Sequence, residues 1–320
     1  MKPDGVAQRL YAQYFCGENL SEKVTSSHWK EEEKNYRQEA PGEGSNIELI
    51  CRGMGVLKWR DGKQRLLDLL SYALHMAVLP GRLNILRHHL RLRPVIRRLG
   101  ADLTMEVVFR HLCTAALLSR TSPPGGWRSI LMIGDGYGVL GAFLKELYPA
   151  ARITFVDLGK SLTIQASMME KAFPCTPHRC ADAPCQQSEA GFVYCPAEQC
   201  DWLDQDHFDL AVNVASMQEM DPPVVATYFK ILRQRMTGDR MFYCCNRKEK
   251  TLPDGTISRF LDYPWSNKDQ LLVDEPCPWH HFFLSRWPTP KGFHLLGRRV
   301  PWINYYDGMH WHRLVKMSEG

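Results

Sequence analysis

From Trp127 onward, short apolar runs rich in β-forming residues alternate with longer stretches of helical periodicity. The apolar runs are Ile130–Ile133, Ile153–Val156, Phe192–Cys195, Phe208–Val214 and Arg240–Cys245. Helical patterns at Leu140–Tyr148 and Ser161–Phe173 separate the first three runs, and Asp221-Pro222 opens another helix with an N-cap and a first-turn proline. Strands that alternate with helices predict an α/β fold with a mostly parallel sheet, covered by helices on both faces.

The C-terminal end follows a different pattern. Arg298–Tyr306 and Met309–Met317 flank Asp307-Gly308, which is a strong hairpin turn signal. A hairpin at the end of a parallel sheet contributes one antiparallel strand, so we expect a sheet that is mostly parallel with one reversed strand.

The N-terminal part of the chain is predicted to be helical. Leu66–Leu79 and Val107–Leu118 have dense apolar helix patterns, and the arginine-rich stretch Arg82–Arg98 contains Pro94, which predicts a bend or break. Thr121–Gly126 has the composition of a linker. We therefore predict a helical region at residues 1–125, serving as a substrate cap or in oligomerisation, and a second domain at 126–320 with an aromatic-rich insertion at 248–297.

Composition excludes several classes of protein. The net charge of +5 is too small to indicate nucleic-acid binding, and no apolar run approaches the roughly 18 residues of a membrane-spanning helix. Eleven cysteines without a secreted-type spacing predict reduced thiols and a cytoplasmic protein.

The sharpest motif is the glycine-rich segment that follows the first predicted strand. Gly136, Gly138 and Gly141 fit G-x-G-x-x-G, and Asp157 lies 21 residues beyond Gly136 at the end of the second strand. Such glycines let the backbone approach a ligand at a helix N-terminus, and the acid can hold ribose hydroxyls. The pattern predicts a nucleotide-type cofactor, and both dinucleotide dehydrogenases and S-adenosylmethionine (SAM) methyltransferases meet it.

Wider context favours the methyltransferases. The Gly134-x-Gly136-x-Gly138 spacing resembles motif I of class I SAM-dependent methyltransferases, and the C-terminal hairpin resembles their reversed seventh strand. Phe208–Met220, Tyr243–Arg247 and Asp262–Trp265 resemble segments of a bacterial family of sugar O-methyltransferases. The resemblance covers about residues 125 to 317. It implies a Rossmann-like methyltransferase sheet, SAM as the cofactor, and methyl transfer to a hydroxyl of a sugar or glycoconjugate.

The resemblance also implies a cofactor site, residue by residue. Asp157 and Leu158 would hold the ribose, and Ala197 or Glu198 would lie near the adenine. The loop from Asn213 to Glu219 would face the methyl group. The cofactor's amino-acid part would be surrounded by Gly134, Asp135, Gly136 and Gly138. The family usually has an acid two positions before the first glycine, where this chain has Met132.

Methyl transfer to a hydroxyl benefits from a general base. Glu219, after the fourth strand, is the first candidate, and His280 or His281 is the second. We expect the acceptor to contact Ser216, Gln218, Asn246, Arg247 and Trp265. No carboxylate cluster follows the fourth strand, so a metal-independent reaction is expected.

Several alternatives remain open at this stage. The acceptor could be an amine or a phenol, the cofactor could be NAD(P) in an oxidoreductase, or the fold could bind without catalysis. The cysteines from Cys175 to Cys200 do not have the usual zinc spacing, and Arg82–Arg98 fits either a phosphate-binding or a solvated helix face. We expect a small-molecule substrate and no nucleic-acid partner, and the protein could form a homo-oligomer.

Overall fold

The computed structural model describes residues 5–16, 26–32, 36–38, 49–51, 62–79, 81–100, 103–181, 191–280, 282–284, 292–305 and 308–319. Its centre is an eight-stranded sheet with the order β5-β6-β4-β3-β7-β8-β15-β11. The strands are β3 (Ser129–Ile133), β4 (Arg152–Asp157), β5 (His178–Cys180), β6 (Phe192–Pro196), β7 (Phe208–Val214), β8 (Met236–Arg247), β11 (Gln270–Pro276) and β15 (His310–Lys316).

One strand of this sheet is reversed. β3, β4, β5, β6, β7 and β8 are paired in parallel, whereas β15 is antiparallel to β8 on one side and to β11 on the other. The sheet is therefore Rossmann-like and mostly parallel with one reversed strand, which confirms the fold class predicted from the sequence.

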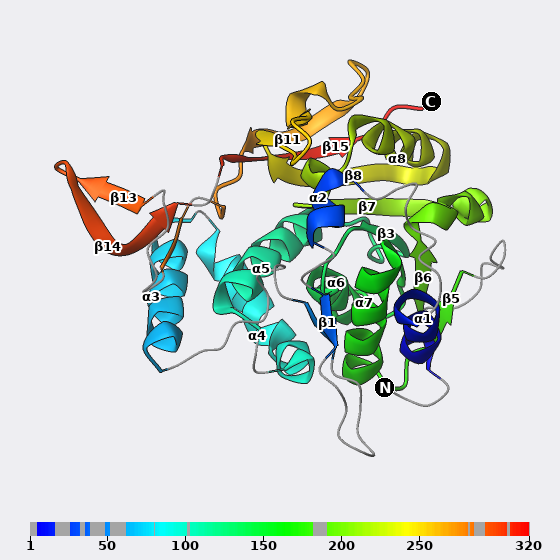
Figure 1. The fold of residues 1–320 in the computed structure, drawn as a ribbon, viewed down its shortest axis with the longest axis horizontal. Coiled ribbons are helices and arrows are strands. Elements are labelled where there is room, and N and C mark those ends of the chain that lie inside the picture. Colours follow the sequence, from blue (N-terminus) through cyan, green and yellow to red (C-terminus); the bar gives the residue numbers. More distant parts are fainter. Residues whose placement is uncertain are drawn as a thin grey trace.

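Helices cover both faces of the sheet (Figure 1). Alternate residues of each central strand point to opposite faces, so β3 contributes Ile130 and Met132 to one core and Leu131 and Ile133 to the other. The first core includes residues of α6 (Val139–Leu147) and α7 (Gly159–Ala172), and the second includes residues of α8 (Pro222–Arg235). Burial on both faces explains why these strands read as continuous apolar runs.

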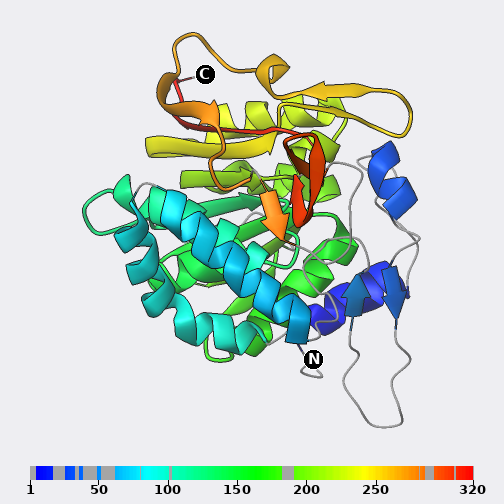
Figure 2. The same cartoon turned by 90° about the vertical axis from the view of Figure 1, so that its left-hand side faces the viewer.

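The N-terminal helices belong to the first of these cores. α1 (Val6–Phe15) packs on α7, α4 (Arg82–Leu99) on α6 and α7, and α5 (Met105–Arg120) on α6. Figure 2 shows α3 (Gly62–Val78) and α4 lying outside the sheet's own helices. Pro94 does not end α4, which runs as one helix to Leu99. The N-terminal helices and the sheet thus share a continuous apolar interior.

The predicted C-terminal hairpin is wrong in its pairing. β14 (Arg298–Tyr305) pairs with β12 (Phe282–Leu284) and β13 (Gly292–Leu295) in a separate three-stranded sheet, and only β15 joins the central sheet. β14 carries Pro301 and is mostly exposed, whereas β15 is mostly buried. A strand with a proline and a polar surface suits a peripheral sheet better than a central one. The edge position is taken by β11, from the segment predicted as an insertion.

Short elements complete the described chain. They are α2 (Ser27–Glu32), the hairpins β1 (Tyr36–Gln38) with β2 (Leu49–Cys51) and β9 (Glu249–Thr251) with β10 (Ile257–Arg259), and the 3-10 helices η3 (Ala197–Gln205), η4 (Met217–Glu219) and η5 (Phe260–Asp262). Among the described residues, no helix has the length and apolar character needed to cross a bilayer.

Asp269 fixes the end of the reversed strand, and we expect its removal to be costly. Its carboxylate accepts two hydrogen bonds from Arg233 of α8 (3.0 and 2.9 Å) and one from the backbone N–H of Ser318 (2.9 Å), just after β15. Asp269→Ala should lower the free energy of unfolding by about 3 kcal/mol because it removes a buried carboxylate that accepts hydrogen bonds from the half-buried Arg233 guanidinium and the Ser318 N–H. Urea unfolding measures this loss. Asp239→Ala, which breaks an exposed pair with Lys316, should cost less than about 1 kcal/mol.

The same carboxylate predicts a pH dependence. Burial alone would raise the pKa of Asp269, but the hydrogen bonds from Arg233 and the serines outweigh it and lower the pKa from 3.8 to about 2. The folded state therefore binds this proton less readily than the unfolded state. The stabilisation should be complete above about pH 4 and be lost as the pH falls toward 2. An equal acid sensitivity of Asp269→Ala and the wild type would contradict this assignment.

Candidate cofactor and acceptor site

The glycine-rich segment forms a tight turn between β3 and α6. Gly134, Gly136 and Gly138 have φ angles of 66°, 56° and 77°, in the left-handed region that favours glycine. A Cβ atom on Gly134 would lie 2.1 Å from the Ser216 hydroxyl oxygen, whereas a Cβ on Gly136 would meet nothing within 4 Å. The loop is thus packed against the protein at its first glycine and open at its second.

Two carboxyl groups lie beside this turn. Asp135 Oδ2 accepts a hydrogen bond from the N–H of Gly141 (2.7 Å) in the first turn of α6. Asp157, at the end of β4, accepts from the Leu158 N–H (2.8 Å) and from Gln165 Nε2 (2.7 Å). Burial raises the pKa of Asp135 to about 8, helped by the nearby Asp157, and burial raises the pKa of Asp157 to about 7. Neither forms an ion pair within the described chain, so this end of the site attracts cations and hydroxyl donors.

A buried amide holds the neighbouring strand ends together. Asn213 Nδ2 donates to the carbonyl oxygen of Ile133 at the end of β3 (2.9 Å) and to the Ser216 hydroxyl. Its Oδ1 accepts from Asn246 Nδ2 on β8 (2.7 Å) and from the Met217 N–H (3.4 Å). In the chain between Asn213 and Ser216, Ala215 has a φ of 59°, a strained value for a residue with a side chain. The loop after β7 is therefore held in one position by the strands on both sides of it.

A cavity of about 460 Å³ lies over these strand ends. Its lining joins the glycine turn, the end of β4 and the loops after β6, β7 and β8 with α2, α5 and the stretch before β12. Such a position, outside the carboxyl ends of parallel strands, is where α/β sheets bind their ligands. Of the residues predicted for the site, the lining contains Gly134, Asp135, Gly136, Asp157, Leu158, Ala197, Ser216, Gln218, Glu219, Arg247 and His280.

The remaining predicted residues lie elsewhere. Gly138 is the N-cap of α6, Asn213 and Asn246 are buried in the amide network, and Glu198 accepts a hydrogen bond from the Tyr14 hydroxyl (2.7 Å). Trp265 packs on Phe229, Phe242 and Phe260 in the second core, because aromatic rings gather there under α8. His281 lies outside the described residues.

Glu219 is paired within the cavity. Its carboxylate contacts Lys250 Nζ at 2.8 Å and His28 Nε2 at 3.4 Å. Burial would raise the pKa of this carboxyl, but the contacts with His28 and Lys250 outweigh burial and lower it. Glu219 is therefore ionised at neutral pH and is a weaker proton acceptor than an isolated carboxylate.

Three histidines form a second group among the residues that line the cavity. His111 of α5, His280 and His310 of β15 all line it, and the rings of His280 and His310 stack with centroids 4.5 Å apart. Burial and the nearby Arg110 together lower the pKa of His111 and of His310 to about 3, and burial lowers the pKa of His280 well below 6.5. All three imidazoles are therefore neutral at pH 7.

Sequence reasoning missed the lining residues that come from outside the sheet loops. These are Ser26, His28 and Trp29 in and beside α2, Arg110 and His111 on α5, and His310 at the start of β15. The one available signal was Arg110-His111, a polar pair inside the dense apolar pattern of Val107–Leu118.

Comparisons with known proteins add the following. No protein-family model matches the sequence, and no curated protein sequence does. Among solved structures, a "putative O-methyltransferase from Klebsiella pneumoniae" is 14% identical over 80% of this chain and 99% of its own, with a TM-score of 0.40. Precorrin-6y C5,15-methyltransferase from Geobacter metallireducens GS-15 is 10% identical (64% and 87% covered, TM-score 0.36). StiE O-MT is 13% identical (52% and 53%, TM-score 0.36), so the chain spans about half its length. These scores are low, and the fold assignment rests on the strand order.

The contact between Gly134 and Ser216 predicts a graded response to adding a methyl group. Gly134→Ala should lower the free energy of unfolding by about 3 kcal/mol, from a left-handed φ and overpacking together. Gly136→Ala should lower the free energy of unfolding by only about 1 kcal/mol, from the left-handed φ alone, because its Cβ has open space. Chemical unfolding measures both. In the double variant Gly134→Ala/Ser216→Gly, part of the loss should be regained. Equal losses for the two alanine variants would contradict the packing described.

Proposed function

We propose that this protein is a SAM-dependent methyltransferase that transfers a methyl group to a hydroxyl, with a sugar or glycoconjugate as the acceptor. The observation that carries the proposal is a single cavity with two different ends. Two carboxyl groups without a cationic partner among the described residues lie at the glycine turn, and neutral histidines lie on the remaining lining.

The acidic end fits the cofactor's chemistry. SAM carries a sulfonium, an ammonium and a ribose diol, and these groups supply the positive charge and the hydroxyl donors that buried carboxyl groups lack. Asp157 would accept from the ribose hydroxyls, and the open side of Gly136 would admit the cofactor close to the backbone. The family usually has an acid at the position that Met132 occupies here. Asp135, inside the loop, would take over its contact with the amino-acid part of the cofactor. Met132 itself is buried in the first core.

The other end favours a neutral hydroxylated acceptor. Arg110, Arg247 and Lys250 line it, and its one described carboxylate, Glu219, is already paired with Lys250. A protonated amine would therefore meet cations without a free anion, which disfavours the amine alternative. Trp29 offers an aromatic face on which the apolar side of a sugar ring can pack.

The chain's own groups would catalyse the reaction mainly by holding the two reactants in line. Among the candidates for the base, we place His111 first because its acceptor atom has no partner among the described residues, although burial weakens this imidazole as a base by lowering its pKa to about 3. Its Nδ1 is buried and has no hydrogen-bond partner in the described part of the chain, and its imidazole is neutral. In contrast, both oxygens of Glu219 are already in contact with Lys250 or His28, and Nδ1 of His280 contacts two sulfurs.

The cofactor is tested by thermal unfolding with SAM, S-adenosylhomocysteine or NADH. An adenosyl ligand at 100 times its dissociation constant should stabilise the protein by about 2.7 kcal/mol. Asp157→Ala should abolish this stabilisation, whereas Asp262→Ala, an exposed acid on η5, should keep it. Stabilisation by NADH alone would favour the oxidoreductase alternative and overturn the proposal. Binding without turnover on any acceptor would favour a non-catalytic protein.

The base is tested by steady-state kinetics on an acceptor found by screening sugars, glycoconjugates, phenols and amines. His111→Gln should lower kcat by roughly 10²-fold or more, the usual range for losing a general base, with the affinity for S-adenosylhomocysteine unchanged. Glu219→Gln should mainly raise KM, because it releases Lys250 and His28. A large kcat loss confined to Glu219→Gln would show that the carboxylate is the base.

A further inference from the structure

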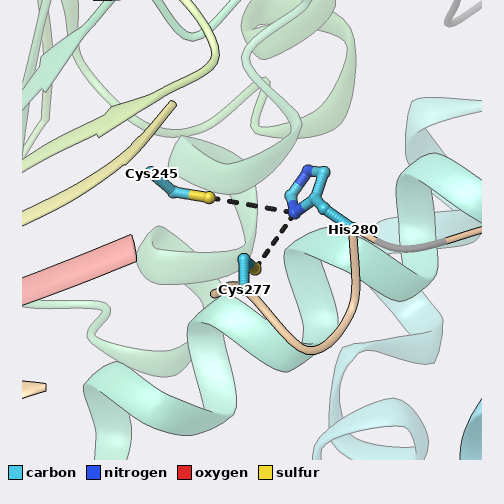
Figure 3. A group of neighbouring side chains, drawn as sticks. All are labelled: Cys245, Cys277 and His280. Carbon is cyan, nitrogen blue, oxygen red and sulfur yellow. Dashed lines mark hydrogen bonds between the residues drawn. The ribbon is translucent and has the colours of Figure 1, made fainter. Parts of the chain in front are cut away.

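Three side chains that carry metal-ligating atoms converge beside the cavity. Cys245 near the end of β8, Cys277 just after β11 and His280 place two sulfurs and one ring nitrogen within 4.8 Å of one another (Figure 3). All three residues are buried, and they come from two separate parts of the chain. The C-terminal pair has the spacing Cys277-x-x-His280, a short separation that zinc-binding turns commonly use.

The three groups are hydrogen-bonded to one another. Both sulfurs are aimed at the same atom, Nδ1 of His280, at 3.8 Å from Cys245 and 3.2 Å from Cys277 (Figure 3). One imidazole nitrogen has a single in-plane site, so it can accept from only one S–H or donate one N–H. Only one thiol can therefore bond to Nδ1, and the two thiols also hydrogen-bond each other. A cation between the three atoms would use all of them as ligands.

The distances also fit a coordinated metal. Zinc bonds of about 2.3 Å to sulfur and about 2.0 Å to nitrogen place neighbouring ligands of a tetrahedron roughly 3.5 Å apart for S and N. The observed separations of 3.8 and 3.2 Å lie on either side of that value. Little movement would close the three donors around one ion.

Local structure supports the turn that carries two of the ligands. The backbone N–H of Cys277 donates to the carbonyl oxygen of His310 on β15 (2.8 Å), and that of His280 donates to the carbonyl oxygen of Cys277 (3.3 Å). The backbone N–H of Trp279 also bonds to the Cys277 side chain. Hydrogen bonds of this kind orient metal ligands and stabilise the charge of a thiolate.

We propose that Cys245, Cys277 and His280 bind a zinc ion. Two thiolates balance the charge of Zn²⁺, so the buried site is neutral once the two thiol protons have left to solvent. Soft sulfur donors with one imidazole select zinc over magnesium or calcium. Three protein ligands leave a fourth position for water or another ligand. Since His280 also lines the cavity, the ion would fix the orientation of that ring at the cavity wall.

The site differs from the sequence expectations in two ways. No metal was expected, and the cysteines considered for zinc were those from Cys175 to Cys200. In the described part of the chain, Cys175 is exposed, and the group that can hold a metal is elsewhere. The proposal does not depend on the methyltransferase assignment, since metal content can be measured without any substrate.

The test is metal analysis of the purified full-length chain together with cobalt substitution. The wild type should contain about one zinc ion per chain, and Co²⁺ added to the metal-free protein should give the sulfur-to-cobalt charge-transfer and visible bands of a tetrahedral site. Cys245→Ala and Cys277→Ala should each lose zinc and these bands. Cys244→Ala, which removes the neighbouring buried thiol on β8, should retain both.

The wild-type measurements keep the test decisive where a variant fails to fold. Folded wild type that takes up neither Zn²⁺ nor Co²⁺ at micromolar concentration would overturn the proposal. A disulfide between Cys245 and Cys277 in the protein purified under reducing conditions would also overturn it. Equal zinc loss in Cys244→Ala and the two ligand variants would show that the metal is bound elsewhere.

Discussion

The side chain of Asn213 is the contact on which the rest of the site depends. One amide group, buried below the cavity, bonds to the end of β3, to the loop after β7 and to Asn246 on β8. A fully bonded polar group in an apolar interior is rigid, since breaking any of its bonds leaves an unsatisfied donor or acceptor. Gly134 can then pack directly on Ser216, which positions the glycine turn relative to the loop that carries Glu219.

The chemistry of the cavity follows from how burial acts on opposite kinds of ionisable group. Loss of water raises the pKa of Asp135 and Asp157 and lowers the pKa of His111, His280 and His310, so each group is shifted toward its neutral form. The proposed cationic cofactor would restore the charge of these carboxyl groups. No comparable anion is needed at the histidine end, because the imidazoles are already neutral. The cavity is thereby suited to one charged and one uncharged ligand.

The sequence predicted those cavity residues that lie close together in the chain. The glycine turn, Asp157 and the loop from Asn213 to Glu219 each lie within or beside a single strand–loop–helix unit. Spacing predicted the turn and Asp157, and the family resemblance implied the loop. Trp29, His111 and His310 come from segments separated by up to 281 residues, and only tertiary packing brings them to one cavity. The C-terminal hairpin was mispredicted for a related reason. Turn chemistry at Asp307-Gly308 is local, whereas the choice of strand partner depends on burial, which favoured β11 over β14.

The proposed zinc site and the choice of catalytic base constrain each other. When Nδ1 of a histidine is bound to a metal, the proton of the neutral ring is on Nε2. His280 would then be a hydrogen-bond donor through Nε2, and it could not accept the proton that the hydroxyl loses. The stacked ring of His310 lies against this donor. His111, on a different helix and with a buried nitrogen that lacks a partner in the described chain, would then be the proposed acceptor, and burial makes it a weak base.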